Sequence, residues 1–382
     1  MRLTARETEI LDLLRRDPLI GPAEIARRLK SSRAAVAVHL SSLAKKGAIL
    51  GRGYVVRGAT YVAVIGGANI DIKTRIDGDT VLASSNPGRA TVSAGGVARN
   101  IAHNLCKLGT AAKLVSVVGD DAEGRRLIEE TAKAGVDVSA VLRGAKATGL
   151  YSAVLDRAGE LVIGVAAMEI LDELSVKELA KRQAMLEGAA MLVADCNLGS
   201  DALAYIAERA GAKKIPLLIE PVSVAKAAKL ALLLKDGAAP DIVTPNLKQM
   251  EVLAGRSLRS ALDIRHAAED LHRQGVTHIL LGLGAKGTLL SSLMDGELAQ
   301  CQIPSAAGDV RDVTGAGDSL VAGFLHGLMR GDAPLDAAVF GQAAAALTVG
   351  ATSTVSDLLN ESAVAAKAVQ VKRTLAAKAG VG

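Results

Sequence analysis

Aromatic side chains are almost absent from this 382-residue chain, which has no Trp, four Tyr and two Phe. Proteins usually hold single-stranded nucleic acid by stacking its bases on aromatic rings. So few rings argue against such a platform, and against any site that grips its ligand by stacking. Half of the residues are nevertheless apolar and 22% are charged, which is typical of a globular chain and not of a disordered one. The length favours two domains of unequal size.

Cysteine is also scarce, and its three copies, Cys106, Cys196 and Cys301, lie far apart. This spacing fits neither a disulfide framework nor a paired-cysteine metal site, and it favours a reducing compartment. The six histidines show no metal-ligand spacing either. The sequence contains no apolar run of about 18 residues and no secretory leader pattern. We therefore expect a cytoplasmic protein that contacts no membrane and has no protein-ligated metal site.

Positive charge is concentrated at the start of the chain. Residues 1–57 contain twelve Lys/Arg against five Asp/Glu, a net charge of +7, whereas the other 325 residues contain 33 against 35, a net charge of −2. A basic segment on a nearly neutral remainder is the asymmetry expected when only that segment meets a polyanion. We expect residues 1–57 to form a separate domain.

Three short helices are predicted within this basic segment. Thr4–Glu7 is a capping-box pattern that opens the first helix, and Pro22 stands at the first helical position of the second. Ser31 or Ser32 caps the third helix, and Gly47 is a plausible end for it. All three helices carry apolar residues at helical spacing, which predicts a small shared core.

A β-hairpin is predicted next, because residues 49–56 place two apolar runs around Gly-Arg-Gly. Three helices and a basic hairpin resemble the winged helix-turn-helix. The resemblance implies that the third helix enters the major groove of double-stranded DNA, with Ser32, Arg33 and His39 near its reading face and Arg52 on the wing. The alternative is a small dimerisation or spacer module whose charges are only solvated.

From Tyr61 onward, short apolar runs alternate with amphipathic helical patterns, which predicts an α/β domain with a parallel sheet covered on both faces. The expected strands are 61–65, 112–118, 191–194, 215–219, 241–243 and 278–281. The expected helices are 97–108, 121–134, 175–187, 200–210, 223–234, 246–254 and 260–274. Residues 72–93 and 148–165 break the alternation and predict a small second sheet, a lid over a ligand crevice.

The strongest chemical signal is the phrase DVTGAGD, residues 312–318, followed at once by an apolar helix. Its glycines allow close backbone approach, and the helix start offers unpaired N–H groups to an anion. Asp318 lies in the first turn, where the helix dipole favours an ionised carboxylate of ordinary pKa. This pairing makes sense if a substrate hydroxyl gives its proton to Asp318 while a phosphoryl group settles on the N–H groups. The alternative is a Gly-rich turn with a capping aspartate.

Together with GANIDI (67–72) and SAGGVARN (93–100), this phrase resembles the ribokinase-like (PfkB) family of sugar kinases over roughly residues 61–370. The resemblance implies a ribokinase-like α/β three-layer sandwich with a small β lid in residues 58–382. The further phrases SNPG (85–88) and VADCN (193–197) resemble the pseudouridine kinase branch. A winged helix-turn-helix also precedes the kinase domain in relatives of that branch.

The resemblance implies roles for the matching residues. Asp318 is the base that deprotonates the sugar 5′-hydroxyl, and the amides of Gly315, Ala316 and Gly317 hold the transferred phosphoryl group. The implied ribose contacts are Asn69, Asp71, Gly95, Gly96 and Asn100. The candidate base contacts are Ser85, Asn86 and Asn197, with turn formation as the alternative, and Lys73 is equally plausible as a lid surface charge. The implied ATP contacts are Asn246, Gly284, Gly287, Asp312 and Thr314.

Three features of the sequence bear on how ATP and magnesium are bound. Gln249 stands where the family has a Glu that organises water around magnesium, and Glu220 stands where the branch has Asp. Magnesium is therefore inferred from the chemistry of ATP, whose phosphates normally bind it. Residues 282–287 form a GxGxxG pattern, but β-like sequence follows where a dinucleotide fingerprint needs a helix. We expect a loop over ATP there.

We therefore expect an ATP- and magnesium-dependent kinase that phosphorylates the 5′-hydroxyl of pseudouridine. One alternative is another nucleoside or ribose kinase of the same family. The other is a DNA-binding regulator whose kinase-like domain senses a nucleoside. A homodimer is also expected, because winged-helix readers often act in pairs and lids of this family sometimes interlock.

Overall fold

The structure, a computed structural model, describes residues 3–16, 20–49, 60–306, 308, 310, 312–351 and 353–379. The chain divides into two compact units, Met1–Thr60 and Tyr61–Gly382, which we call the head and the body. The domain boundary predicted between residues 57 and 58 lies outside the described residues, as does most of the predicted hairpin with Arg52. Head and body have separate apolar cores.

The head contains the helices α1 (Ala5–Arg16), α2 (Pro22–Arg28) and α3 (Arg33–Lys45). The predicted capping box is present: the N–H of Thr4 donates to Glu7 (2.7 Å) and the N–H of Glu7 donates to Thr4 Oγ1 (3.2 Å). Ser32 is the cap of α3, since its Oγ accepts from the N–H of Ala35 (3.1 Å). Gly47 follows α3 with φ of 68°, the left-handed conformation that glycine tolerates best.

Glu7 joins the first and third helices of the head. Its buried carboxylate accepts hydrogen bonds from Lys46 and Ser42, each at 2.7 Å. The bond from Lys46 is the largest of the causes that lower the pKa of Glu7 to about 2. Beneath this contact lies an apolar core whose fully buried members include Ile10, Leu14, Ile25, Val36 and Leu43. Burial of each such side chain stabilises the fold by roughly 1.5–3 kcal/mol.

The main sheet of the body has eight strands in the order β14-β13-β12-β11-β10-β9-β1-β4. Their bounds are β1 Val62–Ile65, β4 Ala112–Val115, β9 Met191–Asp195, β10 Leu217–Glu220, β11 Ile242–Val243, β12 His278–Gly282, β13 Thr288–Met294 and β14 Glu297–Ile303. Six strands are parallel as predicted, but β13 and β14 are antiparallel. The physical reason is their connections, which are too short for the crossover that parallel strands need.

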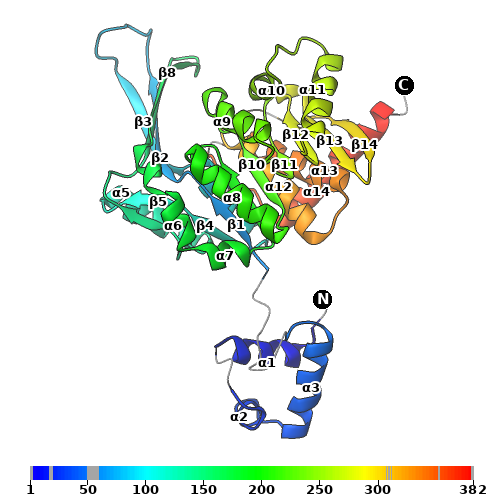
Figure 1. The fold of residues 1–382 in the computed structure, drawn as a ribbon. Helices are drawn as coiled ribbons and strands as arrows, with labels where there is room; N and C mark the ends of the chain where they lie inside the picture. Colours follow the sequence, from blue (N-terminus) through cyan, green and yellow to red (C-terminus); the bar gives the residue numbers. More distant parts are fainter. Residues whose placement is uncertain are drawn as a thin grey trace. The chain divides into compact units, whose positions relative to one another are not determined.

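Helices cover both faces of this sheet, which gives three layers (Figure 1). One face carries α4 (Val97–Lys107), α12 (Ala316–Arg330), α13 (Pro334–Thr348) and α14 (Glu361–Ala379). The other carries α8 (Ser200–Lys213), α9 (Val224–Lys235), α10 (Leu247–Ala254) and α11 (Ala261–Arg273). Alternate residues of β1 enter the two cores: Val62 and Val64 one, Ala63 and Ile65 the other. This is the three-layer α/β sandwich that the sequence predicts.

Two predicted elements are divided in the structure. The segment 112–118 splits at Ser116 into β4 and β5 (Val117–Gly119), and β5 pairs with β6 (Leu142–Gly144) in a separate two-stranded sheet. The predicted helix 175–187 is two short helices, α6 (Val176–Ala180) and α7 (Gln183–Glu187). The predicted helix 121–134 is a single helix, α5 (Ala122–Lys133), which follows β5. No helix in the described residues is long and apolar enough to cross a membrane.

A second sheet stands off the layered body, as expected for the lid (Figure 1). Its strands, in the order β3-β2-β7-β8, are β3 (Gly88–Gly95), β2 (Asn69–Ile76), β7 (Leu150–Leu155) and β8 (Leu161–Ala167). The β8 strand is exposed along its whole length although it carries no charged residue. We call these four strands the lid. A short helical turn, η1 (Glu169–Glu173), follows β8.

Candidate active site

The segment 312–318 forms an anion cradle at the start of α12. Gly315 is the cap residue and has φ of 79°, and a Cβ there would lie 1.9 Å from the carbonyl oxygen of Thr354. Only glycine therefore fits this turn without displacing backbone. Within the described residues, the N–H groups of Gly317 and Asp318 have no hydrogen-bond partner, while the N–H of Ala316 donates to Val313 at 3.3 Å. Two free donors thus point away from the helix start.

Asp318 is the acid at this helix start, and its carboxylate oxygen Oδ2 accepts a hydrogen bond from Asn100 Nδ2 at 2.9 Å. Burial raises the pKa of Asp318 to about 7; the bond from Asn100 opposes this shift, and the nearby charges of Asp195 and Asp71 add to it. The expectation of an ordinary carboxylate pKa for Asp318 is therefore wrong. Desolvation outweighs the helix dipole here.

Arg99 orients the asparagine that contacts Asp318. Its guanidinium is buried and donates to Asn100 Oδ1 (3.2 Å), to the carbonyl of Ala94 (3.3 Å) and to Thr131 Oγ1 (3.2 Å). Because Oδ1 of Asn100 is held by Arg99, its amide nitrogen faces Asp318. Burial lowers the pKa of Arg99 to about 10, which still leaves it charged at neutral pH. Sequence analysis missed this residue, and its only signal was its place beside Asn100.

The other predicted ribose contacts lie next to this pair, where β2 and β3 meet α4. Asn69 Nδ2 donates to Asp71 Oδ1 at 2.7 Å, and burial raises the pKa of Asp71. A Cβ at Gly95 would lie 2.3 Å from the Asp71 carboxylate, and one at Gly96 would lie 2.4 Å from the carbonyl oxygen of Gly67. The two glycines therefore let the lid and the start of α4 approach each other closely.

Asp195 braces the floor of this region from the end of β9. It is fully buried and accepts hydrogen bonds from the N–H groups of Gly67 (2.8 Å), Ala98 (3.0 Å) and Asn197 (2.9 Å). These three bonds fix the glycine turn after β1, the first turn of α4 and the loop after β9. The side chain of Asn197 is held in turn by Lys226, which donates to its Oδ1. Part of the VADCN phrase thus has a structural explanation.

Glu220, at the end of β10, adds another acid beside Asp195. Burial raises its pKa well above the ordinary value, and the charges of Asp318 and Asp195 raise it further. It accepts from the N–H of Val222 at 2.6 Å. Val222 has φ of 66°, which is strained for a β-branched residue. Such strain often occurs at functional sites.

The predicted nucleotide contacts lie at the ends of β11 and β12. Asn246 caps α10 in a reciprocal capping box: its Oδ1 accepts from the N–H of Gln249 (3.0 Å), and Gln249 Oε1 accepts from the N–H of Asn246 (2.8 Å). Gln and Glu both complete such a box. The departure at Gln249 is therefore compatible with the local fold.

The GxGxxG segment has no helix after it, as expected. It forms the single turn η2 (Gly284–Lys286) and then enters β13. Gly287 has φ of 91°, and a Cβ there would lie 2.1 Å from the carbonyl oxygen of Ile303, whereas Gly284 (φ of 59°) has open space around it. The turn is therefore packed at its base and open at its tip.

The remaining predicted nucleotide contacts, Asp312 and Thr314, form a tight turn ahead of the cradle. The N–H of Thr314 donates to Asp312 Oδ1 at 2.8 Å. Lys73 of the lid strand β2 donates to Asp312 Oδ2 (2.7 Å) and to Thr314 Oγ1 (2.8 Å). Lys73 is therefore not a solvated surface charge of the lid, which was one of the two interpretations.

Asn86 lies apart from this cluster, in the hairpin loop between β2 and β3. Its amide accepts from the N–H of Val81 (2.9 Å) and donates to the carbonyls of Val81 (2.9 Å) and Ser84 (3.1 Å). The neighbouring Ser85 is exposed. These bonds occupy the Asn86 side chain within its own loop, which favours the turn-forming interpretation over base recognition.

In the head, the predicted reading face lies on α3. Ser32 and Arg33 are exposed at its start, and His39 is partly buried. Val38 is 68% exposed, which sequence analysis did not predict for an apolar residue.

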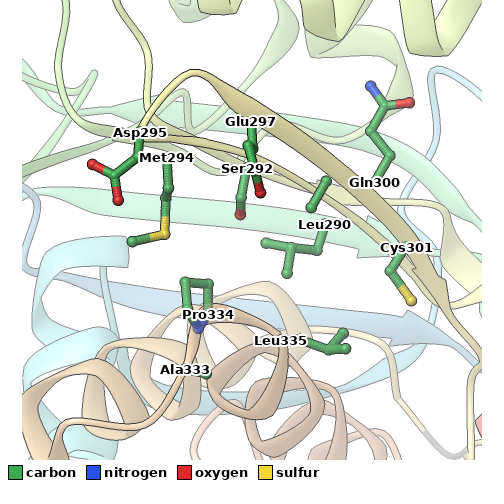
Figure 2. Close-up of a pocket in the computed structure, with 11 residues that line it drawn as sticks. Leu290, Ser292, Met294, Asp295, Glu297, Gln300, Cys301, Ala333, Pro334 and Leu335 are labelled. Atoms are coloured by element: carbon green, nitrogen blue, oxygen red, sulfur yellow. The ribbon is translucent and has the colours of Figure 1, made fainter.

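An apolar groove of about 530 Å³ lies elsewhere, between the β13–β14 hairpin and the start of α13 (Figure 2). Leu290, Met294 and Cys301 line one wall, and Pro334 and Leu335 line the other. Burial raises the pKa of the Cys301 thiol, which makes it a weaker nucleophile at neutral pH. The groove shares no residue with the cluster around Asp318, where the titratable groups converge, and we place the chemistry at that cluster.

Comparisons with known proteins agree with this geometry. The family model for pfkB family carbohydrate kinases matches residues 59–361, and that for winged helix-turn-helix DNA-binding domains matches residues 3–49. The uncharacterized sugar kinase YeiI of Escherichia coli K12 is 37% identical over 90% of this chain and 93% of its own. The pseudouridine kinase of the same organism is 33% identical over 69% and 82%.

Solved structures give the same result. A carbohydrate kinase from Agrobacterium tumefaciens, 31% identical, superposes with a TM-score of 0.68 over 81% of this chain and 97% of its own. Ribokinase from Arabidopsis thaliana, at 22% identity, shares the fold with a TM-score of 0.71 over 81% of this chain and 99% of its own. The chain belongs to the pfkB family of carbohydrate kinases and carries an N-terminal winged helix-turn-helix domain.

Proposed function

We propose that the body transfers the γ-phosphoryl group of ATP to the 5′-hydroxyl of pseudouridine. The observation that carries the transfer is a carboxylate with a pKa near 7 in the first turn of α12, where the N–H groups of Gly317 and Asp318 have no partner among the described residues. A base with a pKa near the working pH is well suited to proton transfer. The choice of pseudouridine rests on 33% identity to the E. coli pseudouridine kinase and on the SNPG and VADCN phrases.

In this reaction Asp318 takes the proton from the 5′-hydroxyl, whose oxygen forms a bond to the γ-phosphorus. The bond from that phosphorus to the bridging oxygen breaks, and ADP leaves. The amides of Gly315, Ala316 and Gly317 receive the charge on the transferred group, which requires Ala316 to release its 3.3 Å contact with Val313. Most of the protein's contribution to such a loose transition state is positioning.

The acceptor is held between the lid and α4. We assign its ribose hydroxyls to Asn69, Asp71 and Asn100, because a carboxylate and two amides offer both donors and acceptors. Gly95 and Gly96 make the close approach possible. For the base we keep Asn197, whose side chain lies on the floor beside Gly67, as the main candidate, and Ser85 and Asn86 as weaker ones.

ATP is assigned to the opposite side. Its phosphates would meet Asn246, Asp312 and Thr314, and the turn carrying Gly284 and Gly287 would cover its nucleoside. Magnesium would enter through the phosphates, because the described residues contain no group of three or more side chains placed to hold a metal ion. Bound in this way, the ion would neutralise phosphate charge near the cradle, where Asp318 and Asp312 are acidic.

The substrate test is a comparison of kcat/KM for pseudouridine, uridine, adenosine and ribose, with ATP consumption and product mass as readouts. We expect pseudouridine to give the highest value and a monophosphate as product. A preference for ribose or adenosine would move the assignment to another kinase of the same family. No ATP turnover with any acceptor would favour the alternative of a nucleoside sensor.

A second function is proposed for the head, which we infer binds double-stranded DNA through α3 and its net charge of +7 in residues 1–57. Exposed Arg33 at the start of α3 supports this assignment, and Ser32, His39 and Arg52 are its other proposed contacts. The full chain should bind duplex DNA with an affinity that falls steeply with salt. Arg33→Ala should weaken that binding and leave kinase activity unchanged. Salt-independent binding, or none, would contradict this function.

We also propose a cytoplasmic homodimer. The exposed apolar strand β8, at the edge of the lid, is a surface that a second copy of the chain could cover. Light scattering of the full chain tests this, since a monomer at micromolar concentration would contradict it.

A further inference from the structure

Lys73 connects the lid to the phosphoryl cradle, a link that neither the resemblance nor the comparisons assigned. It lies on the lid strand β2, and its ammonium group bonds to Asp312 and Thr314, which are 239 and 241 residues away in the chain. The side chains of Lys73 and Asp312 are only 21% and 28% exposed. The pair is therefore shielded from most of the solvent screening that weakens surface ion pairs.

The position of Lys73 on its strand makes this link informative. Side chains two residues apart on a strand point to the same side, so Lys73 shares a face of β2 with Asp71. Asp71 is a proposed ribose contact and lies close enough to Asp318 to influence its pKa. One face of a single lid strand therefore carries both an acceptor contact and a cation bonded to the cradle segment.

The positive charge of Lys73 also offsets the negative charge of Asp312, which lies close to where the phosphates of ATP are proposed to bind. Although burial raises the pKa of Asp312, the hydrogen bonds from Lys73 and Thr314 outweigh it and hold the pKa below its ordinary value, so Asp312 is ionised. An unpaired carboxylate there would repel the phosphates of ATP. Lys73 neutralises this carboxylate on one oxygen, while the N–H of Thr314 occupies the other.

We propose that Lys73 is a positioning residue that couples closure of the lid over the nucleoside to assembly of the cradle for the transferred phosphoryl group. The proposal rests on the proposed kinase function of the same site. When the lid closes, Lys73 reaches the Asp312–Thr314 turn and fixes it in the shape that leaves the amides of Gly317 and Asp318 free. When the lid is open, the turn lacks its cation and the cradle is incomplete.

The variants that test this are Lys73→Met, which removes the charge, and Lys73→Arg, which keeps it. Arg75→Met is the matched control, because Arg75 lies two residues further on the same face of β2 and donates to the carbonyl of Arg157 within the lid. We expect Lys73→Met to lower kcat roughly 10²-fold, the loss typical of a small misplacement of reacting groups. Lys73→Arg should recover at least part of this loss, and Arg75→Met should stay within about twofold of wild type.

Two further measurements separate positioning from a general loss of structure. In the wild type, the acceptor should tighten binding of a non-hydrolysable ATP analogue, and Lys73→Met should abolish that tightening while leaving analogue binding without acceptor nearly unchanged. The double variant Lys73→Met/Asp312→Asn should lose less activity than the product of the two single losses, because the two side chains act through each other.

The design distinguishes failure of this proposal from failure of the proposed function. If ribose or another nucleoside is the preferred acceptor, the same variants are compared with that acceptor. If no acceptor is turned over, hydrogen exchange of residues 312–318 is compared between Lys73→Met and Arg75→Met, and only the former should exchange faster. Equal kcat, equal coupling and equal exchange in these two variants would overturn the role of Lys73.

Discussion

The acceptor side and the nucleotide side of the proposed active site are built in different ways. On the acceptor side and at the cradle, polar side chains bond to one another across long sequence separations: Asn100 to Asp318, Arg99 to Thr131, and Lys73 to Asp312. On the nucleotide side, within the part of the chain that the structure describes, the side chains of Asn246 and Gln249 bond only to the backbone of their own turn. Substitutions on the acceptor side should therefore affect the chemistry, and substitutions on the nucleotide side should affect local stability.

The largest effect should come from Asp318→Asn, which removes the base from the acceptor side. We expect kcat to fall roughly 10²–10⁴-fold, the usual contribution of general base catalysis, with little change in ATP affinity. Asp336→Asn is the matched control, because Asp336 occupies the same third position of the neighbouring helix α13 but is exposed and pairs with Lys372. Steady-state kinetics of both variants decide, and wild-type turnover by Asp318→Asn would contradict the proposed mechanism.

The next largest fall in kcat is expected from Gly315→Ala, at the turn where the acceptor side and the nucleotide side meet. The new Cβ would lie 1.9 Å from the carbonyl oxygen of Thr354 at a residue with φ of 79°, so the turn must move. Misdirected cradle amides should lower kcat by roughly 10²-fold, the cost of losing one oxyanion donor. Gly308→Ala serves as the control, because a Cβ there meets nothing within 4 Å. Equal kcat in both variants would show that the cradle does not depend on this turn.

The sequence predicted backbone features better than side-chain networks. The caps at Thr4 and Ser32, the lid and six parallel strands follow from local patterns, which act over a few residues. The contact of Lys73 with Asp312 and the role of Arg99 could not be predicted, because they join residues that only the fold brings together. The pKa of Asp318 was misjudged for the same reason, since desolvation depends on packing that no motif displays.

An intermediate effect is expected from pH, again on the acceptor side. Asp318 must be ionised to accept a proton, and its pKa is raised to about 7, so kcat/KM should be constant above pH 7 and fall about tenfold per pH unit below it. Asn100→Leu removes a hydrogen bond that lowers this pKa, and its midpoint should shift to higher pH. The measurement is kcat/KM for the nucleoside with saturating ATP, from about 1.5 pH units below the expected midpoint to about 2 units above it. If the pH profile of kcat/KM instead had its midpoint near the pKa of a free carboxyl group, Asp318 with its raised pKa would not be the catalytic base.

The smallest effect on turnover should come from Gln249, on the nucleotide side. Gln249→Ala removes the acceptor for the N–H of Asn246 and leaves half of the capping box, which should cost about 1 kcal/mol of unfolding free energy. Because Gln249 bonds only within its own turn, kcat should stay within about threefold of wild type, the scatter of ordinary non-catalytic substitutions. Gln249→Glu keeps the box and restores the residue typical of the family, so its stability should match wild type.

The decisive comparison is of denaturant unfolding with kcat at several magnesium concentrations. A large rise of kcat in Gln249→Glu at low magnesium would show that the nucleotide side does organise the metal, and the contrast between the two sides would then fail.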